Sequence, residues 1–267
     1  MTTFEDLTSS LDRLSKAVKA AATARSRHDK KTAHLIETAA KEAASLEWHR
    51  GEEILRKEAK QFDESQEQAL RQRRESLKSQ AQQAKVPFHP YDKSDRIGIF
   101  DVRYSGLGVT IELGGVEVDS FDEADGERLY KRLQDARGSL DAQPLDRKEF
   151  FRDIKAAYTT ARRNSREGDY VLVNAIHSNL LLERARHDDR FIRDPNPKNI
   201  APYPLFQFVY DLARFLNDAE GPRCGSERIQ TQAPSMRESK VAVQIPSLRN
   251  PVGTETSVAR LAVVSVS

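Results

Sequence analysis

The sequence predicts an α+β protein with a long N-terminal coiled-coil or helical arm, a small antiparallel sheet with a helix, and a C-terminal winged-helix-like module. Residues 1–85 consist mostly of strong helix formers and repeat apolar side chains every three and four residues. Residues 96–120 alternate apolar and polar side chains between glycine turns. Residues 144–267 have the pattern of three helices followed by two strands. We therefore predict three domains, residues 1–85 (the arm), 86–143 and 144–267.

Composition limits the class of protein. The 267 residues carry 43 Lys and Arg against 41 Asp and Glu, so the net charge of +2 gives no overall field that would attract nucleic acid. The single cysteine, Cys224, excludes an internal disulfide and a cysteine-rich zinc site, and fits a reducing compartment. The N-terminus does not resemble a signal peptide, and no apolar run approaches the roughly 20 residues of a membrane span. We expect a soluble, cytoplasmic protein with no membrane partner.

A narrow apolar stripe runs along the arm and predicts assembly. Such a stripe is unstable on a lone helix in water, so it must pack against a partner helix. We therefore expect a homodimer or another coiled-coil partner. The residues expected to form the seam are Phe4, Leu7, Leu11, Leu14, Val18, Leu35, Leu46, Leu55 and Phe62.

The phase of the stripe changes within the arm, and two arrangements follow from this. The seam positions are polar around His28, and the repeat shifts after Trp48. One arrangement is a single helix of about 80 residues, roughly 120 Å long, which would require a dimer. The other is a helical hairpin that turns at residues 26–31 or near Gly51, which would not.

Residues 86–143 predict a three-stranded meander and one helix. Val86 and Pro87 begin the segment that ends the arm, because proline cannot continue a helix. The strands are expected from Arg96, Val109 and Val116. Asp122 is expected to cap a helix that stops at Gly138, and residues 139–144 read as a linker.

Residues 144–267 have the element order of a winged helix. We expect a helix from Asp146 with a basic outer face, a second helix after a short extended lead-in at residues 170–173, a proline-rich loop at 194–204, and a buried third helix from Leu205. Two valine-rich stretches should then pair as a terminal hairpin. We expect an irregular segment at residues 220–239 and the first strand at 240–246. The wing is expected at residues 247–257 and the second strand at 258–267.

Local basic clusters suggest contact with duplex DNA, because Lys and Arg neutralise phosphates. The residues expected to bind DNA are Arg152, Lys155, Arg162, Arg163, Arg166 and Arg249. The third helix is a poor reader of bases, since only Gln207, Asp211, Arg214 and Asn217 are polar on it. We expect a non-enzymatic DNA-associated protein that assembles through its coiled coil. The alternative is a scaffold or accessory subunit of a larger DNA-handling ATPase complex that binds protein rather than DNA.

Patterns for metal or cofactor chemistry are weak. His187, Asp188 and Asp189 form the densest potential metal group, but adjacent residues on a helix point apart. No glycine-rich phosphate loop occurs, so neither a metal nor a cofactor is expected. Asp101 and Glu112 on neighbouring strands resemble the acids of a metal-dependent nuclease, although Gly114 stands where such a site usually has lysine. Enzyme activity is therefore not expected, and a hydrolase stays an alternative.

Overall fold

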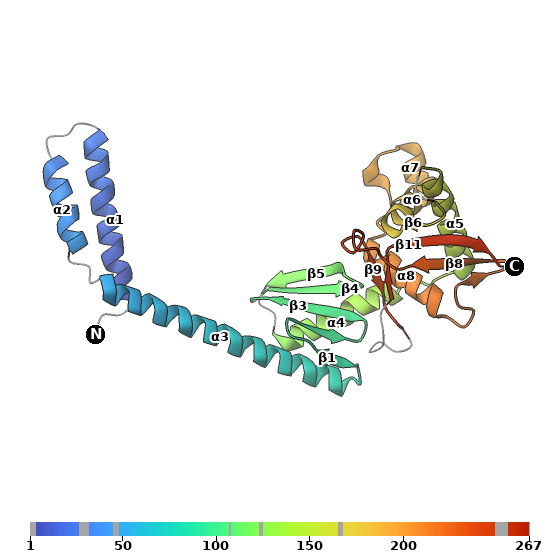
Figure 1. Cartoon of the computed structure of the whole chain (residues 1–267), viewed down its shortest axis with the longest axis horizontal. Coiled ribbons are helices and arrows are strands. Elements are labelled where there is room, and N and C mark those ends of the chain that lie inside the picture. Colours follow the sequence, from blue (N-terminus) through green and yellow to red (C-terminus); the bar gives the residue numbers. More distant parts are fainter. Residues whose placement is uncertain are drawn as a thin grey trace. The chain divides into compact units, whose positions relative to one another are not determined.

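The computed structural model describes residues 4–26, 32–44, 48–106, 108–122, 125–164, 168–248 and 256–266 (Figure 1). It combines helices with small antiparallel sheets, which confirms the predicted α+β class. The chain divides into two compact units, Met1–Arg71 and Gln72–Ser267. The predicted division into three domains stays a prediction. Within the described ranges, no helix is both long and apolar enough to cross a membrane.

The first unit contains a helical hairpin. Helix α1 (Phe4–Ser26) packs beside α2 (Thr32–Ala44), and α3 (Trp48–Gln83) is the third helix of the chain (Figure 1). A single helix of about 80 residues is therefore wrong, and the hairpin that breaks at residues 26–31 agrees with the structure. The physical reason is the polar stretch around His28, where a continuous seam would bury charged and polar side chains. Residues 27–31 themselves lie outside the described residues.

The second unit begins within α3 and continues into a five-stranded antiparallel meander of order β1-β2-β3-β4-β5. Its strands are β1 (Phe88–Pro90), β2 (Ser94–Ile97), β3 (Phe100–Ser105), β4 (Gly108–Leu113) and β5 (Val116–Asp122). The prediction of three strands is wrong at its start. Gly98, with φ of 58°, turns the chain so that Ile97 pairs with Phe100, and the expected first strand is a hairpin. Strand β1 was hidden by Pro87 and Pro90, which are tolerated at a sheet edge.

Helix α4 (Gly126–Asp141) packs on this sheet and shares its core with the last turns of α3. The predicted cap at Asp122 is wrong, because Asp122 belongs to β5, and Asp125 accepts a hydrogen bond from the backbone N–H of Arg128 at 2.7 Å. The helix also passes Gly138 and ends three residues later, within the predicted linker. Leu77 and Ala81 of α3 are fully buried in this core.

A close approach between α4 and α3 makes Gly126 sensitive to substitution. A Cβ added there would lie 2.6 Å from Ser76 Cβ and 2.7 Å from the carbonyl oxygen of Arg73, whereas one added at Gly138 would meet nothing within 4 Å. We expect Gly126→Ala to lower the free energy of unfolding by about 1–3 kcal/mol through overpacking. Gly138→Ala, on the same helix, should raise it by up to about 1 kcal/mol. Chemical denaturation of both variants tests this, and losses of equal size would contradict it.

The C-terminal part of the second unit is built on three main helices and two small sheets. Its helices are α5 (Arg147–Asn164), α6 (Val173–Ala185), α7 (Asp189–Arg193) and α8 (Leu205–Asn217), with a 3-10 turn, η1 (Pro197–Asn199), inside the predicted proline-rich loop. The predicted positions of the three main helices and of the lead-in, β6 (Val171–Leu172), agree with the structure.

The strands differ from the prediction. The four-stranded antiparallel sheet has the order β6-β11-β8-β7, with β7 (Arg223–Cys224), β8 (Glu227–Gln232) and β11 (Arg260–Ser265). Strands β7 and β8 lie in the segment predicted to be irregular, because β8 is polar at all but one position.

The predicted pairing of the terminal hairpin is also wrong. Strand β9 (Val243–Ile245) pairs with β10 (Thr256–Val258), whereas β11 pairs with β8. The chain changes sheet at Ala259, whose N–H donates to the carbonyl of Gln232 and whose carbonyl accepts from the N–H of Val173. Of the second valine-rich stretch, Val258 pairs with Val243 of the first, whereas Arg260–Ser265 pairs with β8.

Candidate functional site

Helix α8 is enclosed on all sides within the second unit. None of its residues is exposed, and eight of the 13 are buried. Phe208, Leu212 and Phe215 belong to the core shared with α5, α6 and the four-stranded sheet, whereas Tyr210 belongs to the core of the five-stranded sheet and α4. A helix between two cores cannot enter a DNA groove without unfolding one of them.

The polar side chains of α8, predicted as its only possible DNA contacts, bond within the protein. Gln207 donates to Asp211 at 3.2 Å, Arg214 donates to the carbonyl of Gln143 at 2.9 Å, and Asn217 donates to the carbonyl of Ala213 at 2.8 Å. These contacts hold the helix against its surroundings, so direct base reading by α8 has no structural support.

Asp211 is the centre of a buried polar network. The Tyr203 hydroxyl donates to it at 2.7 Å, and the Arg184 guanidinium lies 4.1 Å from the centre of the Tyr203 ring. Burial raises the pKa of Asp211 and also that of Tyr203. His177 contacts the carbonyl of Tyr203 through Nε2 at 2.8 Å, and burial lowers the pKa of its imidazole. The network joins the segment before α8 to α6 and α8.

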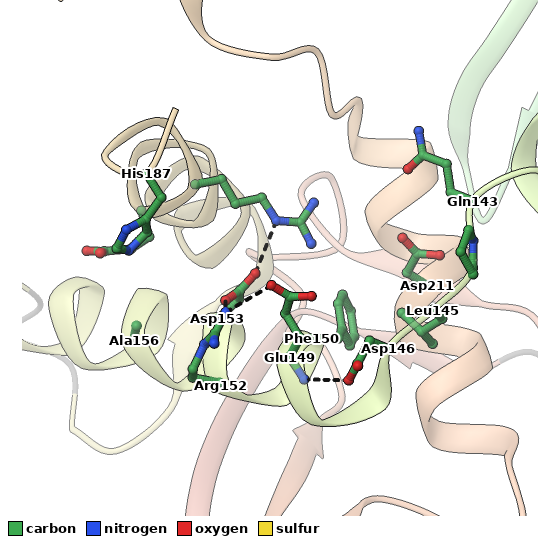
Figure 2. Close-up of a pocket in the computed structure, with 13 residues that line it drawn as sticks. Gln143, Leu145, Asp146, Glu149, Phe150, Arg152, Asp153, Ala156, His187 and Asp211 are labelled. Carbon is green, nitrogen blue, oxygen red and sulfur yellow. Dashed lines mark hydrogen bonds and ion pairs between the residues drawn. The ribbon is translucent and has the colours of Figure 1, made fainter. Parts of the chain in front are cut away.

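A cavity of about 520 Å³ lies beside this network, between α5, α6 and the chain before α5 (Figure 2). Charges of both signs line it, and its carboxylates have partners. Asp146 accepts from the N–H of Glu149 at 2.9 Å, and Asp153 pairs with Arg152 at 3.2 Å and with Arg184 at 3.3 Å. Asp146 therefore caps the start of α5, and Asp153 holds α5 to α6 through Arg184. No pattern in the sequence indicates this cavity, because its lining comes from segments about 70 residues apart.

The predicted DNA-binding residues of α5 are largely paired with acids. Arg152 contacts Glu149 at 3.1 Å in addition to Asp153. Lys155 contacts Glu227 of β8 at 2.7 Å, and Arg162 forms an ion pair with Asp169. DNA phosphates would have to compete with these acids.

The remaining predicted DNA-binding residues are Arg163, Arg166 and Arg249. Arg163 is exposed near the end of α5, close in sequence to Arg162. Arg166 and Arg249 lie outside the described residues. The structure thus places four of the six predicted cations on one helix, with Arg162 and Arg163 in its last turn.

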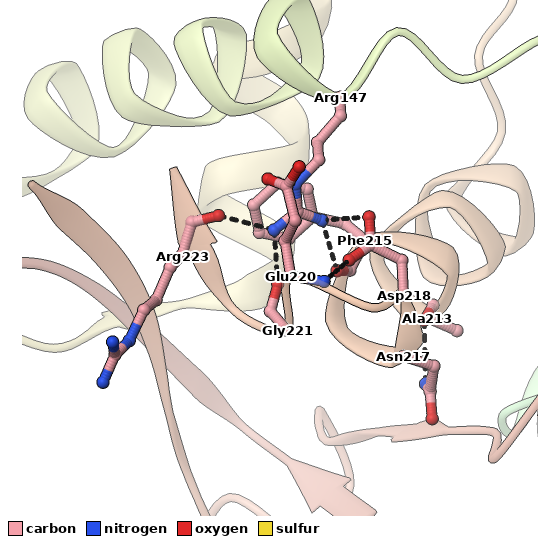
Figure 3. Close-up of polar contacts among 8 residues, drawn as sticks. All are labelled: Arg147, Ala213, Phe215, Asn217, Asp218, Glu220, Gly221 and Arg223. Carbon is pink, nitrogen blue, oxygen red and sulfur yellow. Dashed lines mark hydrogen bonds and ion pairs between the residues drawn. The ribbon is translucent and has the colours of Figure 1, made fainter. Parts of the chain in front are cut away.

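Arg147, at the start of α5, binds the C-terminal end of α8 and the chain that follows it (Figure 3). Its guanidinium donates to the carbonyls of Phe215, Gly221 and Arg223, pairs with Asp218, and lies 4.0 Å from the centre of the Phe215 ring. Because a cation at a helix C-terminus is favourable and the carbonyls there lack helical partners, this arginine caps α8. Its role is to fix the two helices together.

A second buried arginine contact holds α3 to the five-stranded sheet. Arg74 donates to both carboxylate oxygens of Asp95, the closest at 2.6 Å, and the Tyr104 hydroxyl donates to the same group at 2.7 Å. The Asp95 side chain is fully buried. One feature of the sequence indicates that Asp95 is buried. Asp95 lies two residues before Ile97, on the same face of a strand as a core residue.

The two acids considered for a nuclease lie opposite one another in the β3–β4 pair, as expected. Asp101 is bound by Arg96 through two hydrogen bonds of 2.6 and 3.1 Å, and Glu112 pairs with Arg103 at 2.9 Å. Burial raises the pKa of Glu112.

A metal group was also considered at His187, Asp188 and Asp189. Asp188 caps α7 by accepting from the N–H of Arg190 at 2.8 Å. Within the part of the chain that the structure describes, no three His, Cys, Asp or Glu side chains gather in a way that could hold a metal ion.

The predicted seam of α1 separates into two lines with different exposure. Leu7 and Ala21 are 8 % exposed, and Leu14 between them is half-buried. We call Phe4, Leu11 and Val18, which are 44, 38 and 50 % exposed, the outer line. The outer line is not covered by the hairpin and presents large apolar side chains at intervals of seven residues.

The other predicted seam residues lie on α2 and α3. Leu35 is half-buried in the hairpin, whereas Leu55 and Phe62 of α3 are 49 and 61 % exposed and are also seven residues apart. Leu46 lies outside the described residues. Exposed apolar side chains thus follow heptad spacing on α1 and on α3, which is typical of unpaired coiled-coil positions, and Ile36 of α2 is exposed outside this spacing.

Comparisons of the chain with models of protein families, with curated proteins and with solved structures gave no match.

Proposed function

We propose that the protein is a non-catalytic assembly protein that binds another protein chain through its helical arm. The observation that carries this proposal is the outer line of α1, whose three large apolar side chains are each more than a third exposed at seven-residue intervals. Side chains exposed in this way are stabilised by burial, at about 1.5–3 kcal/mol for each one fully buried. Heptad spacing specifies a helical partner rather than a small molecule or a nucleic acid.

The C-terminal part of the second unit supports the same proposal, because the helix expected to read DNA is enclosed and two of the expected DNA-binding cations are paired. Helix α8 would be the recognition helix of a winged helix, but it has no exposed residue, and its polar side chains bond internally. Lys155 and Arg162 are paired with acids. The scaffold or accessory subunit is therefore favoured over the DNA-associated protein.

Capture experiments test the arm. We expect replacement of the outer line by serine, in Phe4→Ser/Leu11→Ser/Val18→Ser, to weaken binding of the full chain to its protein partner by at least about tenfold. Ile192→Ser is the matched control, because Ile192 is 59 % exposed but belongs to the second unit. Equal binding by wild type, triple variant and control would contradict the proposal.

Contact with the DNA backbone is a second candidate function. It is supported by the three main helices α5, α6 and α8, by the antiparallel strands β8 and β11 that follow them, and by the neighbouring positions of Arg162 and Arg163. Fluorescence titration with duplex DNA tests it. With the pairing seen here, we expect binding no tighter than the non-specific range of about 10⁻⁴–10⁻⁶ M at physiological salt. Tighter binding that falls steeply with salt and is lost in Arg162→Ala/Arg163→Ala would favour DNA.

A further inference from the structure

The outer line of α1 has charged neighbours that also repeat every seven residues. Glu5, Asp12 and Lys19 each follow a residue of the outer line by one position and so lie along one flank of it. Their order along the helix is acid, acid, base. Asp12 is already paired with Lys16 at 2.8 Å, which leaves Glu5 and Lys19 as the charges at the two ends of the line.

These charges distinguish the two ways in which α1 could pair with a copy of itself. In a parallel pair with twofold symmetry, the charged flanks of the two helices lie on opposite sides of the interface, so Glu5 and Lys19 gain no opposite charge across the pair. In an antiparallel pair centred on Leu11, Phe4 faces Val18 of the second copy and Glu5 comes close to Lys19. Because equivalent flanks face one another in an antiparallel pair with twofold symmetry, this contact forms twice.

The surface around the outer line permits close approach of a second helix. The small residues Thr8 and Ser15 lie between the outer line and the flank that carries Glu5, Asp12 and Lys19. The Thr8 hydroxyl donates to the carbonyl of Phe4 at 2.9 Å, so it can be covered without losing a partner. Since α1 also packs beside α2, pairing two hairpins through α1 would give an arrangement of four helices, a stable architecture for short helices.

We propose that α1 packs antiparallel against α1 of a second copy of this chain, through Phe4, Leu11 and Val18, with Leu11 on the twofold axis. The partner is a second copy because apolar spacing and end charges are complementary to themselves when the helix is reversed. The inference rests on the proposed function, since it names the partner of the same arm surface.

Charge exchange in the full chain tests the direction of pairing. Glu5→Lys and Lys19→Glu are each expected to weaken dimerisation about fivefold at low salt, because each removes two attractive contacts and adds two repulsive ones. The double variant Glu5→Lys/Lys19→Glu should regain the affinity of the wild type. Glu58→Lys, an exposed acid on α3, is the matched control and should leave the dissociation constant unchanged. Sedimentation velocity measures the constants, and circular dichroism checks that the helices are retained.

Two outcomes would overturn the inference. A dimer in which the double variant is no tighter than the single variants excludes the antiparallel pair. A chain that remains monomeric at the highest concentration it reaches excludes the second copy as partner. Neither outcome decides the proposed function, which fails only when the serine variants of the outer line bind protein partners as the wild type does.

Discussion

Asp95→Ala is expected to lower the free energy of unfolding of the second unit by about 3–5 kcal/mol, because it leaves the guanidinium of Arg74 without its buried carboxylate. Asp95 is fully buried, and the Arg74 side chain is 24 % exposed. The Tyr104 hydroxyl loses its acceptor in the same variant. Burial, together with the hydrogen bond to Asp95, raises the pKa of Tyr104, so this hydroxyl stays a donor throughout the physiological range. Equilibrium unfolding in guanidinium chloride measures the loss.

Two controls isolate the buried ion pair. Tyr104→Phe removes one hydrogen bond and should cost about 1 kcal/mol. Asp119→Ala removes the more exposed pair with Arg132, whose side chains are 37 and 50 % exposed, and should cost less than about 1 kcal/mol. A loss for Asp95→Ala no greater than that of Asp119→Ala would show that the Arg74 contact does not hold α3 to the sheet.

Gly114→Ala is expected to be the most damaging single-methyl substitution in the sheet. Gly114 has a φ of 60°, and an added Cβ would lie 2.1 Å from the carbonyl oxygen of Gln244. The carbonyl of Gly114 also accepts from the N–H of Gln244 at 2.9 Å, so movement of the chain would break a contact between the β4–β5 turn and β9. We expect a loss above about 4 kcal/mol from left-handed strain and displacement of β9 together.

Gly115→Ala separates these two effects. Gly115 has a φ of 78°, but an added Cβ would meet nothing within 4 Å. It should therefore cost only the conformational strain, about 1–2 kcal/mol. Denaturant midpoints of the two variants provide the comparison. Equal losses would mean that backbone conformation, rather than contact with β9, makes Gly114 necessary.

Secondary structure was predicted well where periodicity was strong and poorly where a single residue decided the outcome. Helices α5, α6 and α8 followed from their apolar spacing. The hairpin at Gly98 was missed because the alternation of apolar residues continues through the turn without a visible break. Strand β8 was missed because Ile229 is its only fully buried residue, and the rest of the strand reads as a polar loop.

The arm shows what heptad spacing can and cannot specify. It predicted Phe4, Leu11 and Val18 as seam residues together with Leu7 and Leu14. It could not specify which of these the hairpin uses, because that depends on where the chain turns back.

The basic cluster of α5 shows a different limit. The cations were visible in the sequence, but their partners were not. Lys155 pairs with Glu227, which lies 72 residues further along the chain, on a strand that periodicity did not predict. Counting cations on a helix therefore overestimated the charge available to DNA. The hydrophobic composition of α8 indicated that this helix is enclosed. The two cores that enclose it could not be predicted, because they depend on the assembled fold.

The mass of the full chain in solution, measured by light scattering over a range of concentrations, tests the arm-mediated assembly most directly. Wild type is expected to approach the mass of two chains, whereas Phe4→Ser/Leu11→Ser/Val18→Ser should remain at the mass of one chain. The Ile192→Ser control should behave as the wild type. A wild-type chain that stays at the mass of one chain at every concentration would contradict self-association through the outer line.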